Sequence, residues 1–397
     1  MSKIIVVGAG ASGVIASLIA SVNNEVILLD GEDKVLKKIL LTGNGKCNYW
    51  NSDIKINKYN SNSLDSLNYI ISDELVNNTY KYLESLGIYP CIKNGYYYPY
   101  SNQASSVREI LVKALRKSNV TVITNCKVRN IYKSNNIFLV DTNSKKFSCD
   151  KVVLATGSKA YPKTGSDGSG YSLASSLGHT IVPVRSALAP LVLNETFLKE
   201  WDGVRSFGKV SLKVDNNILK EEIGEVQLTK YGISGICIFN LSSKASLKLQ
   251  ENKRVFLNIN FFNETNNFYE FLEKRNRDNK TIEELLESIF NYKLMFVFLK
   301  KASVDKDSYW SELSEEEKQK LVQVIINFEV EVVGIVDDKG QVCAGGVSLD
   351  EVNDKTLESN IVNNLYFTGE LLDVDGMCGG FNLAFAFMSG YLVGRSI

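Results

Sequence analysis

The stretch Lys3–Asp30, KIIVVGAGASGVIASLIASVNNEVILLD, decides the fold of this chain. A short apolar run, Lys3–Val7, leads into three closely spaced glycines, and apolar residues then recur at helical spacing as far as Val22. A second buried run, Glu25–Asp30, ends in an acid. This order of strand, glycine turn, helix and strand predicts a βαβ unit at the start of an α/β nucleotide-binding fold.

The three glycines have the GxGxxG spacing, and each has a physical role. Gly8 permits the tight turn, Gly10 lets backbone approach a pyrophosphate, and Gly13 lets the helix pack close to the strand. The helix N-terminus then presents N–H groups and a positive dipole end to the phosphates. Asp30 lies 22 residues after Gly8 and can accept hydrogen bonds from ribose hydroxyls, whereas it would repel a 2′-phosphate. The motif predicts FAD or NAD; a glycine turn that only packs is the alternative.

Two further segments favour FAD over NAD. Thr42–Asn48 (TGNGKCN) has two close glycines, which indicates backbone approach to a bulky group. Phe367–Asn382 (FTGELLDVDGMCGGFN) combines a strand end, an acidic loop, a Gly-Gly pair and the start of an apolar helix. A second helix N-terminus directed at the ligand suits a reduced flavin or the pyrophosphate.

The length of 397 residues predicts two or three domains. Residues 1–185 and 348–397 are expected to form a nucleotide-binding domain in two parts. Between them, alternating polar and apolar runs predict a β-rich insertion over 186–280 and 328–347. Within that insertion a helical subdomain is expected over 281–327, with capping boxes at Thr281 and Ser314.

Composition excludes several classes of protein. Lys+Arg and Asp+Glu both number 45, so nothing supplies the basic surface of a dedicated nucleic-acid-binding protein. The N-terminus lacks a signal-peptide pattern, and the apolar run Leu383–Val393 is shorter than the roughly 20 residues of a membrane span. Seven scattered cysteines without a CxxC pair predict reduced thiols in a cytoplasmic protein, and neither a disulfide framework nor a metal site. The oligomeric state stays open.

The chain resembles the BaiN-like (YhiN-type) bacterial NAD(P)/FAD-dependent oxidoreductases of the glutathione-reductase-like FAD superfamily. The resemblance runs in family order along nearly the whole chain, and its second and last segments are long and specific. The matching segments are GAGASG (8–13), KKILLTGNGKCN (37–48), YYPYSNQASSV (97–107), LATGSKAYPKTGSDGSGY (154–171), LTKYGISG (228–235), AGGVSLDEV (344–352) and TGELLDVDGMCGGFNLAFAFMSG (368–390).

The resemblance implies a GxGxxG Rossmann-like FAD-binding domain interrupted by an antiparallel β-barrel-like domain and a small helical subdomain. It implies pyrophosphate contacts near the first glycines and a backbone contact from Val128 to the adenine. It also implies a contact from Asp30 to the adenosine ribose, at a position where the family more often has Glu. The usual Gly-Gly of the second cofactor loop is Gly157-Ser158 here. The implied cofactor-binding residues are Gly8, Gly10, Ala11, Ser12, Gly13, Asp30, Lys38, Gly43, Gly45, Cys47, Asn48, Val128, Thr156, Gly157, Gly369, Glu370, Gly379, Gly380, Phe381 and Asn382.

Three residues have both a reactive and a structural interpretation. Cys47 lies in a flavin loop and has the chemistry for a charge-transfer pair, although a small buried side chain is the favoured interpretation. A pair between Cys47 and Cys378 is conceivable, but the sequence does not place the two sulfurs within bonding distance. His179 is the only histidine, and a packing role is favoured over a general-acid role.

Two clusters have alternative interpretations as well. The tyrosines at 96, 97, 98 and 100 are expected either to line a substrate channel or to pack between domains. The acids Glu370, Asp373 and Asp375 are interpreted as hydrogen-bonding and capping groups in preference to metal ligands.

The predicted function is an FAD-dependent oxidation or reduction of a small, apolar organic molecule by hydride transfer at flavin N5. No second strand–GxGxxG–helix unit occurs, since GSDGSG at 165–170 lacks the spacing. Either NAD(P)H docks transiently at the flavin, or an organic substrate reduces the flavin and oxygen or another acceptor reoxidises it. The resemblance adds reduction of unsaturated steroid-like compounds and amine oxidation as activities proposed for the family. The alternatives are a flavin-dependent RNA-modification protein, which the zero net charge disfavours, and a non-catalytic flavin redox sensor.

Overall fold

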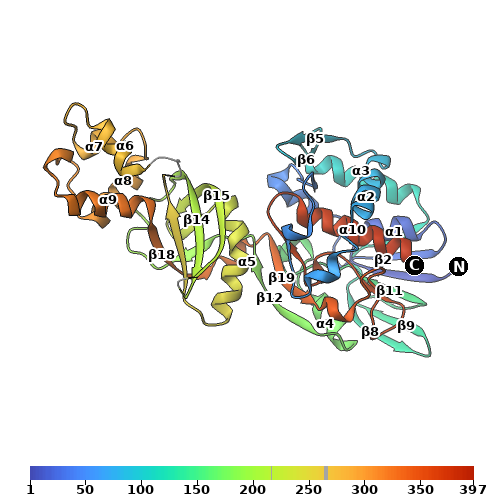
Figure 1. Cartoon of the computed structure of the whole chain (residues 1–397). Coiled ribbons are helices and arrows are strands. Elements are labelled where there is room, and N and C mark those ends of the chain that lie inside the picture. Colours follow the sequence, from blue (N-terminus) through green and yellow to red (C-terminus); the bar gives the residue numbers. More distant parts are fainter. Residues whose placement is uncertain (216, 263–266) are drawn as a thin grey trace. The chain divides into compact units, whose positions relative to one another are not determined.

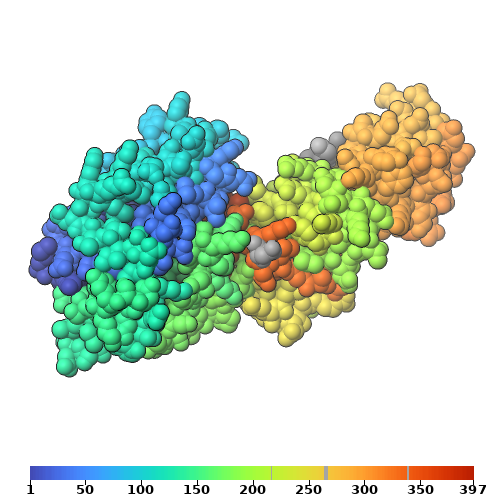
Figure 2. Space-filling model, turned by 180° about the vertical axis from the view of Figure 1, so that it is seen from behind, coloured from blue at the N-terminus to red at the C-terminus, as the bar shows by residue number. Residues whose placement is uncertain are grey.

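The computed structural model describes residues 1–215, 217–262 and 267–397. The chain divides into two compact units, the first made of residues 1–185 and 341–397 and the second of residues 186–340 (Figure 1). Figure 2 shows the chain in space-filling form, with the N-terminal part of the first unit in blue to green. The predicted α/β class with an inserted antiparallel barrel is confirmed.

A five-stranded parallel sheet forms the centre of the first unit, and its strand order is β20-β11-β1-β2-β7. The two βαβ strands sit in the middle, so the turn that follows β1 lies at the carboxyl end of a central strand. Both faces are covered, which explains the continuous apolar runs. The strands are β1 (Lys3–Val7), β2 (Glu25–Leu29), β7 (Val120–Ile123), β11 (Lys151–Leu154) and β20 (Leu365–Phe367).

Helices α1 (Ala11–Ala20) and α10 (Phe381–Ser396) lie side by side in the first unit (Figure 1). Their backbones approach closely, because a Cβ on Gly390 would stand 2.3 Å from the carbonyl oxygen of Ser12. The apolar helix predicted near the C-terminal end is therefore a buried helix of the nucleotide-binding unit. Within the described ranges, no helix has the length and apolar character needed to cross a membrane.

Smaller elements surround this core. Two small sheets have the strand orders β10-β9-β8 and β3-β6-β5, and β12 pairs with β19 where the chain leaves and re-enters the first unit. These elements are β3 (Trp50–Asn51), β4 (Tyr59–Asn60), α2 (Asp73–Ser85), β5 (Pro90–Lys93), β6 (Tyr96–Pro99), α3 (Ala104–Lys117), β8 (Val128–Ser134), β9 (Ile137–Thr142), β10 (Lys146–Cys149), α4 (Ser169–Ser176), β12 (Ile181–Ala187), β19 (Val342–Val347) and β21 (Asp375–Gly376). Short 3₁₀ turns include η1 (Lys38–Gly45) and η8 (Gly369–Leu371).

A closed antiparallel barrel with strand order β13-β16-β15-β14-β17-β18 forms the centre of the second unit. Its helices share one apolar core with the barrel. Both predicted capping boxes are present, at Thr281 with Glu284 and at Ser314 with Glu317. The elements are β13 (Leu191–Leu193), β14 (Arg205–Val214), β15 (Asn217–Thr229), β16 (Gly232–Ser234), α5 (Ile236–Gln250), β17 (Val255–Asn260), α6 (Phe268–Arg275), α7 (Ile282–Leu286), α8 (Tyr292–Ala302), α9 (Glu315–Ile326) and β18 (Phe328–Ile335).

The unit boundaries differ in detail from the expected domain ranges. Strand β19 belongs to the first unit, although the expected insertion extends to residue 347, because β19 pairs with β12 and packs on η8. Helix α6 begins at Phe268, inside the range expected to be β-rich. Residues 263–266 of that range lie outside the described residues. The further division of the insertion into a barrel and a helical subdomain stays a prediction.

Candidate cofactor site

The three fingerprint glycines occupy three different environments. Gly8 has φ +105°, and a Cβ there would stand 2.4 Å from the carbonyl oxygen of Ala155. A Cβ on Gly13 would stand 2.0 Å from the carbonyl oxygen of Gly8. Gly8 is therefore closed by the chain that follows β11, and Gly13 by the turn at Gly8. A Cβ on Gly10, in contrast, would meet no atom within 4 Å. The open space lies in front of Gly10, where the motif predicts the pyrophosphate.

Gly10 is also the N-cap residue of α1, and no side chain caps this helix end. The first N–H groups of an α-helix have no partner inside the helix, so an uncapped N-terminus favours an anion. Side-chain caps such as Ser or Asp would compete with that anion. The open space and the uncapped helix end lie together at the carboxyl end of β1 and fit a phosphate group, so the pyrophosphate contact of Gly10 stays a prediction.

Asp30 follows β2 and braces the glycine turn. Its Oδ2 accepts a hydrogen bond of 2.7 Å from the backbone N–H of Ala9, and its Oδ1 accepts one of 2.8 Å from Glu32. Burial raises the pKa of this carboxyl group, while the two backbone donors oppose the shift. The backbone N–H of Cys126 donates to the Asp30 carbonyl over 2.8 Å, which brings the start of β8 at Val128 beside the same edge. Contacts of Asp30 and Val128 with an adenosine stay predictions.

Lys38, Ser158 and Glu370 meet at one carboxylate oxygen. The Nζ of Lys38 lies 2.5 Å from Oε2 of Glu370, and the Oγ of Ser158 donates to the same oxygen over 3.0 Å. Ser158 is fully buried, and the thiol of Cys343 lies against it. Lys38 and Glu370 were both expected at the cofactor. The sequence shows Ser158 only as a departure from the family's glycine and does not display its contact with Glu370.

A hydrogen-bonded link joins this cluster to α1. The Oγ1 of Thr368 donates to the Oγ of Ser12 over 3.0 Å, and both residues are buried. Gly369 has φ +67°, and a Cβ there would stand 2.7 Å from that same Ser12 hydroxyl. The Ser12 side chain is thus directed at the strand β20 end, while its backbone belongs to the first turn of α1. The fingerprint and the C-terminal segment are therefore in direct contact.

The two glycine-rich loops, 42–48 and 376–382, pack against each other. A Cβ on Gly380 would stand 2.5 Å from the Trp50 carbonyl oxygen and 2.8 Å from the Asn48 side chain. The amide of Asn51 donates to the carbonyl oxygen of Gly379 over 2.8 Å. The Asn382 side chain accepts from the N–H of Gly376 and donates to its carbonyl, both over 2.8 Å, so it clamps its own loop. Flavin contacts of these loops stay predictions.

The predicted acidic residues of this segment hold neighbouring chain in place. The backbone N–H of Asn62 donates to Asp373 over 3.0 Å, and the amide of Asn60 donates to Asp375 over 3.0 Å. Asp373 is buried, and burial raises the pKa of its carboxyl group. Both carboxylates therefore act as hydrogen-bond acceptors that fix the loop before α10.

Strand β6 separates the tyrosines into two sets. The ring of Tyr96 lies 2.5 Å from the Cβ position of Gly379, and the ring of Tyr98 lies 3.7 Å from that of Gly43. Side chains alternate along a strand, and Tyr97 packs edge-on against two tyrosine rings on the other side. Tyr96 and Tyr98 therefore border the glycine loops, while Tyr97 belongs to the core. A substrate channel lined by Tyr96 and Tyr98 stays a prediction, and Tyr97 packs inside the first unit.

Burial disfavours the thiolate form of the two cysteines near these loops. Cys47 is fully buried, and burial raises the pKa of its thiol to about 12. Burial likewise raises the pKa of Cys378 to about 11. Neither residue is in a disulfide. Since the thiolate is the reactive form, the structural interpretation of Cys47 is favoured over the charge-transfer one.

Two buried hydroxyl groups test whether the site fits FAD. The Oγ1 of Thr156 and the Oη of Tyr171 are buried, and neither has a hydrogen-bond partner among the described residues. An unpaired buried hydroxyl costs about 1–3 kcal/mol, so such groups are typical of sites that a polar ligand completes. Both lie close to the Glu370 cluster or the glycine turn, since Tyr171 interacts with Glu370 and Thr156 follows Ala155. The residues fit a cofactor that carries hydroxyl and phosphate groups.

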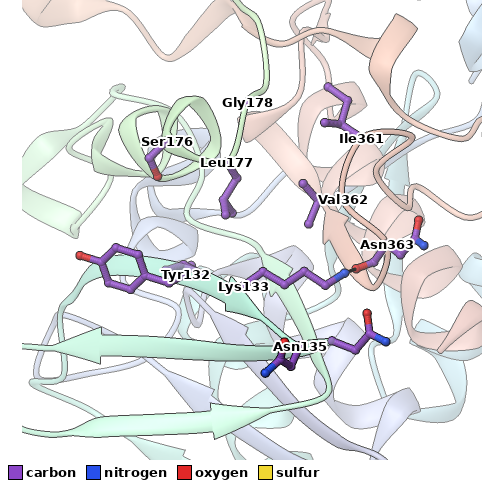
Figure 3. A pocket seen from close by; sticks show the side chains of 11 residues that line it. Tyr132, Lys133, Asn135, Ser176, Leu177, Gly178, Ile361, Val362 and Asn363 are labelled. Carbon is purple, nitrogen blue, oxygen red and sulfur yellow. Dashed lines mark hydrogen bonds between the residues drawn. The ribbon is translucent and has the colours of Figure 1, made fainter.

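A separate pocket of about 760 Å³ lies at the far end of β8 (Figure 3). It is bordered by the β8–β9 hairpin, the end of α4 and residues 361–363, and Lys133 reaches across it to donate to the Asn363 carbonyl. None of the predicted cofactor residues lines it. Its amide and aliphatic lining indicates no particular ligand.

His179 follows Gly178, which lines this pocket, and the side chain of His179 has a structural environment. Its Nε2 is 2.8 Å from the Oγ of Ser359, its Nδ1 is 3.2 Å from Glu351, and its ring packs edge-on against Phe367. Burial lowers the pKa of the imidazole, although the Glu351 carboxylate opposes this shift. The favoured packing role of His179 agrees with these contacts.

Comparison with known proteins places this site in a family. The family described as HI0933-like protein Rossmann domain matches residues 2–396. The chain is 36% identical over 411 residues to the 3-dehydro-bile acid delta(4,6)-reductase of Clostridium scindens, covering 100% of this chain and 99% of that protein. It is 26% identical over 407 residues to the ribosomal RNA dihydrouridine synthase of Escherichia coli, covering 99% and 97%.

The fold is also found in a solved structure. The open conformation of a flavocytochrome c3 fumarate reductase matches with a TM-score of 0.52 at 16% identity, covering 100% of this chain and 78% of that one. This likeness concerns the fold alone. The family match over nearly the whole chain and the fingerprint geometry lead to one conclusion: the chain belongs to the HI0933-like family of FAD-dependent oxidoreductases.

Proposed function

We propose that this protein reduces a carbon–carbon double bond conjugated to a carbonyl group in a small, apolar organic molecule. The observation that carries the proposal is the pairing of an open phosphate cradle at Gly10 with two glycine loops that meet beside Tyr96 and Tyr98. The cradle suits the pyrophosphate of FAD. The loops and tyrosines border the place where the resemblance puts the flavin ring.

The similar proteins support reduction over oxidation. One is named a delta(4,6)-reductase and the other a dihydrouridine synthase. Both names describe addition of hydrogen across a carbon–carbon double bond. The two substrates differ greatly in size, but in each the double bond is conjugated to a carbonyl group. A flavin reaction of this kind is therefore the simplest common activity.

Bound FAD would supply the hydride from its N5. We propose Tyr98 as the proton donor, because its ring borders the glycine loop at Gly43. A phenol is protonated at neutral pH, so the Oη of Tyr98 would donate its proton to the carbon next to the carbonyl. The only histidine in the sequence, His179, is buried against Ser359 and Glu351, and burial raises the pKa of the Cys378 thiol. Solvent would return the proton to Tyr98.

NAD(P)H is proposed as the electron donor, with no domain of its own. The first unit supplies one strand–GxGxxG–helix unit, and the second unit is a barrel with helices. A nicotinamide would therefore dock transiently at the flavin and leave before the substrate enters. This order predicts ping-pong kinetics.

Reduction of a ribosomal RNA is the second candidate, because one similar protein has that name. The charge of the second unit speaks against it. Residues 186–340 contain 25 Asp and Glu against 21 Lys and Arg, and an RNA-binding domain needs a positive surface. We therefore favour the small-molecule substrate.

An anaerobic stopped-flow experiment tests the proposal in two halves. FAD-loaded protein is mixed with NADH or NADPH, and rapid bleaching of the oxidised flavin band is expected with at least one of them. The reduced protein is then mixed with a 4-en-3-one steroid or with an unmodified ribosomal RNA transcript. Return of the oxidised band with the steroid, together with saturated product, supports the proposal. Return of the oxidised band with RNA alone would replace the small-molecule proposal with RNA reduction. If neither substrate speeds up the slow reoxidation of the flavin, the protein would be a redox sensor.

A further inference from the structure

Ser158 is a polar residue buried in a loop where backbone contact with a cofactor is expected. Its side chain is fully buried. The hydroxyl donates to Oε2 of Glu370 over 3.0 Å and accepts from the backbone N–H of Ala160 over 3.2 Å. The second of these bonds holds the Oγ within its own loop, so its donor direction is set by backbone. A buried hydroxyl with both functions satisfied specifies one geometry.

Glu370 receives donors from two distant parts of the chain at one oxygen. Lys38 lies at the start of η1, and Ser158 follows β11. Both donate to Oε2, and none of the described residues is seen to donate to Oε1. Lysine is a flexible point charge that follows a carboxylate as it rotates, whereas the backbone-held Ser158 does not. Ser158 is therefore the contact that fixes the rotation of the Glu370 carboxylate.

We propose that Ser158 is a positioning residue for FAD, which holds Glu370 so that Oε1 accepts a hydrogen bond from a hydroxyl of the ribityl chain. This inference rests on the FAD-binding part of the proposed function and not on the substrate. The adjoining groups fit a ribityl chain, because the unpartnered hydroxyls of Thr156 and Tyr171 lie in the same part of the first unit. A hydroxylated chain provides hydrogen-bond donors and acceptors for Glu370, Thr156 and Tyr171.

The test is the affinity of the apoprotein for FAD, measured by quenching of flavin fluorescence without any substrate. Ser158→Ala removes the donor and keeps the Cβ. Loss of one hydrogen bond through Glu370 is expected to raise the Kd for FAD by about 3- to 10-fold. Ser21→Ala is the matched control, since Ser21 is a buried serine of α1's C-cap that donates only to the Leu18 carbonyl. Its Kd should match that of the unaltered protein.

A double-mutant cycle separates positioning from simple packing. Ser158→Ala is repeated on a Glu370→Gln background, where no further loss of FAD affinity is expected if Ser158 acts through Glu370. The same fold-loss on both backgrounds, or an unchanged Kd for Ser158→Ala, would overturn the inference. An unaltered protein that binds no FAD would overturn the proposed function as well. FAD binding with equal affinity by the Ser158→Ala variant and its parent would overturn only the role of Ser158.

Discussion

Substitution of Gly10 by alanine separates cofactor binding from folding. Gly10 has an ordinary φ of −78°, and a Cβ there would meet nothing within 4 Å. The apoprotein should therefore accept the methyl group at a cost of about 1 kcal/mol, which is the difference between Gly and Ala at an N-cap. The space that the methyl group fills is the space we assign to the pyrophosphate.

The loss of FAD affinity can be estimated from the contacts at stake. A methyl group in the cradle pushes the phosphates away from the first N–H groups of α1. Each charge-assisted hydrogen bond contributes about 1.5–3 kcal/mol, so weakening two of them costs about 3 kcal/mol. That value corresponds to a Kd higher by on the order of 100-fold. Gly13→Ala should behave in the opposite way, because its Cβ would stand 2.0 Å from a backbone oxygen and destabilise the fold itself.

Thermal unfolding of the apoprotein and fluorescence titration with FAD measure the two effects separately. Gly334→Ala in β18 of the second unit is the control, because its Cβ would make only ordinary contact, 3.7 Å from Val192. Gly10→Ala should bind FAD more weakly, and its unfolding temperature should fall only by the small amount that the N-cap cost implies. Gly334→Ala should keep the parent's affinity for FAD and its unfolding temperature. A Gly10→Ala variant that binds FAD as tightly as its parent would refute the assignment of the cradle.

Four other outcomes follow from the same geometry. Gly170→Ala, whose Cβ would stand 1.8 Å from a buried threonine hydroxyl, should lose about 1–3 kcal/mol in urea unfolding, and unchanged stability would contradict the packing described. In native protein at pH 8, Cys47 and Cys378 should react slowly with iodoacetamide, because their pKa values of about 12 and 11 leave few thiolates. Mass spectrometry measures the labelling, and rapid labelling of either thiol would show that its burial is incomplete. The pKa of His179 is lowered in the fold, so below the unfolded pKa near 6.5 the unfolded chain takes up the proton more readily than the folded chain. The free energy of unfolding should therefore be highest above pH 6.5 and fall with pH, by at most about 1.4 kcal/mol per pH unit. In urea titrations from pH 8 to 5, the free energy of unfolding should fall less for His179→Gln than for its parent. An identical dependence on pH in the two proteins would contradict this role of His179. Tyr98→Phe should keep FAD and its bleaching by NAD(P)H but slow the return of the oxidised band with an enone by about 10²-fold or more; an unchanged rate would exclude Tyr98 as the proton donor.

The nucleotide-binding unit could be predicted in detail because its signals are local. Strand β1, helix α1 and strand β2 appear where the glycine spacing and the apolar runs put them. The capping boxes at Thr281 and Ser314 likewise depend on residues three positions apart. In such cases the sequence contains both partners of the interaction side by side.

Other parts depend on contacts that the order of residues does not display. The capping boxes at Thr281 and Ser314 indicate two helices of the second unit, whereas α6 and α8 are present as well. Helix α8 is YKLMFVFLKKA, a short apolar run that periodicity alone does not distinguish from a buried strand. The Glu370 cluster needs residues 38, 158 and 370 together, so only the fold reveals that the serine at 158 is a hydrogen-bond donor to the site.

The position of β20 and α10 in the chain has a consequence for synthesis. Strand β20 completes one edge of the parallel sheet beside β11, and α10 covers α1, yet both come after the whole second unit in the order of translation. A nascent chain that ends before residue 365 leaves an unpaired sheet edge and a bare apolar helix face, which are both prone to aggregation. The barrel and its helices share a core of their own and can fold earlier on the ribosome. The nucleotide-binding unit must therefore close last, and chaperone binding during synthesis is expected to centre on residues 1–185.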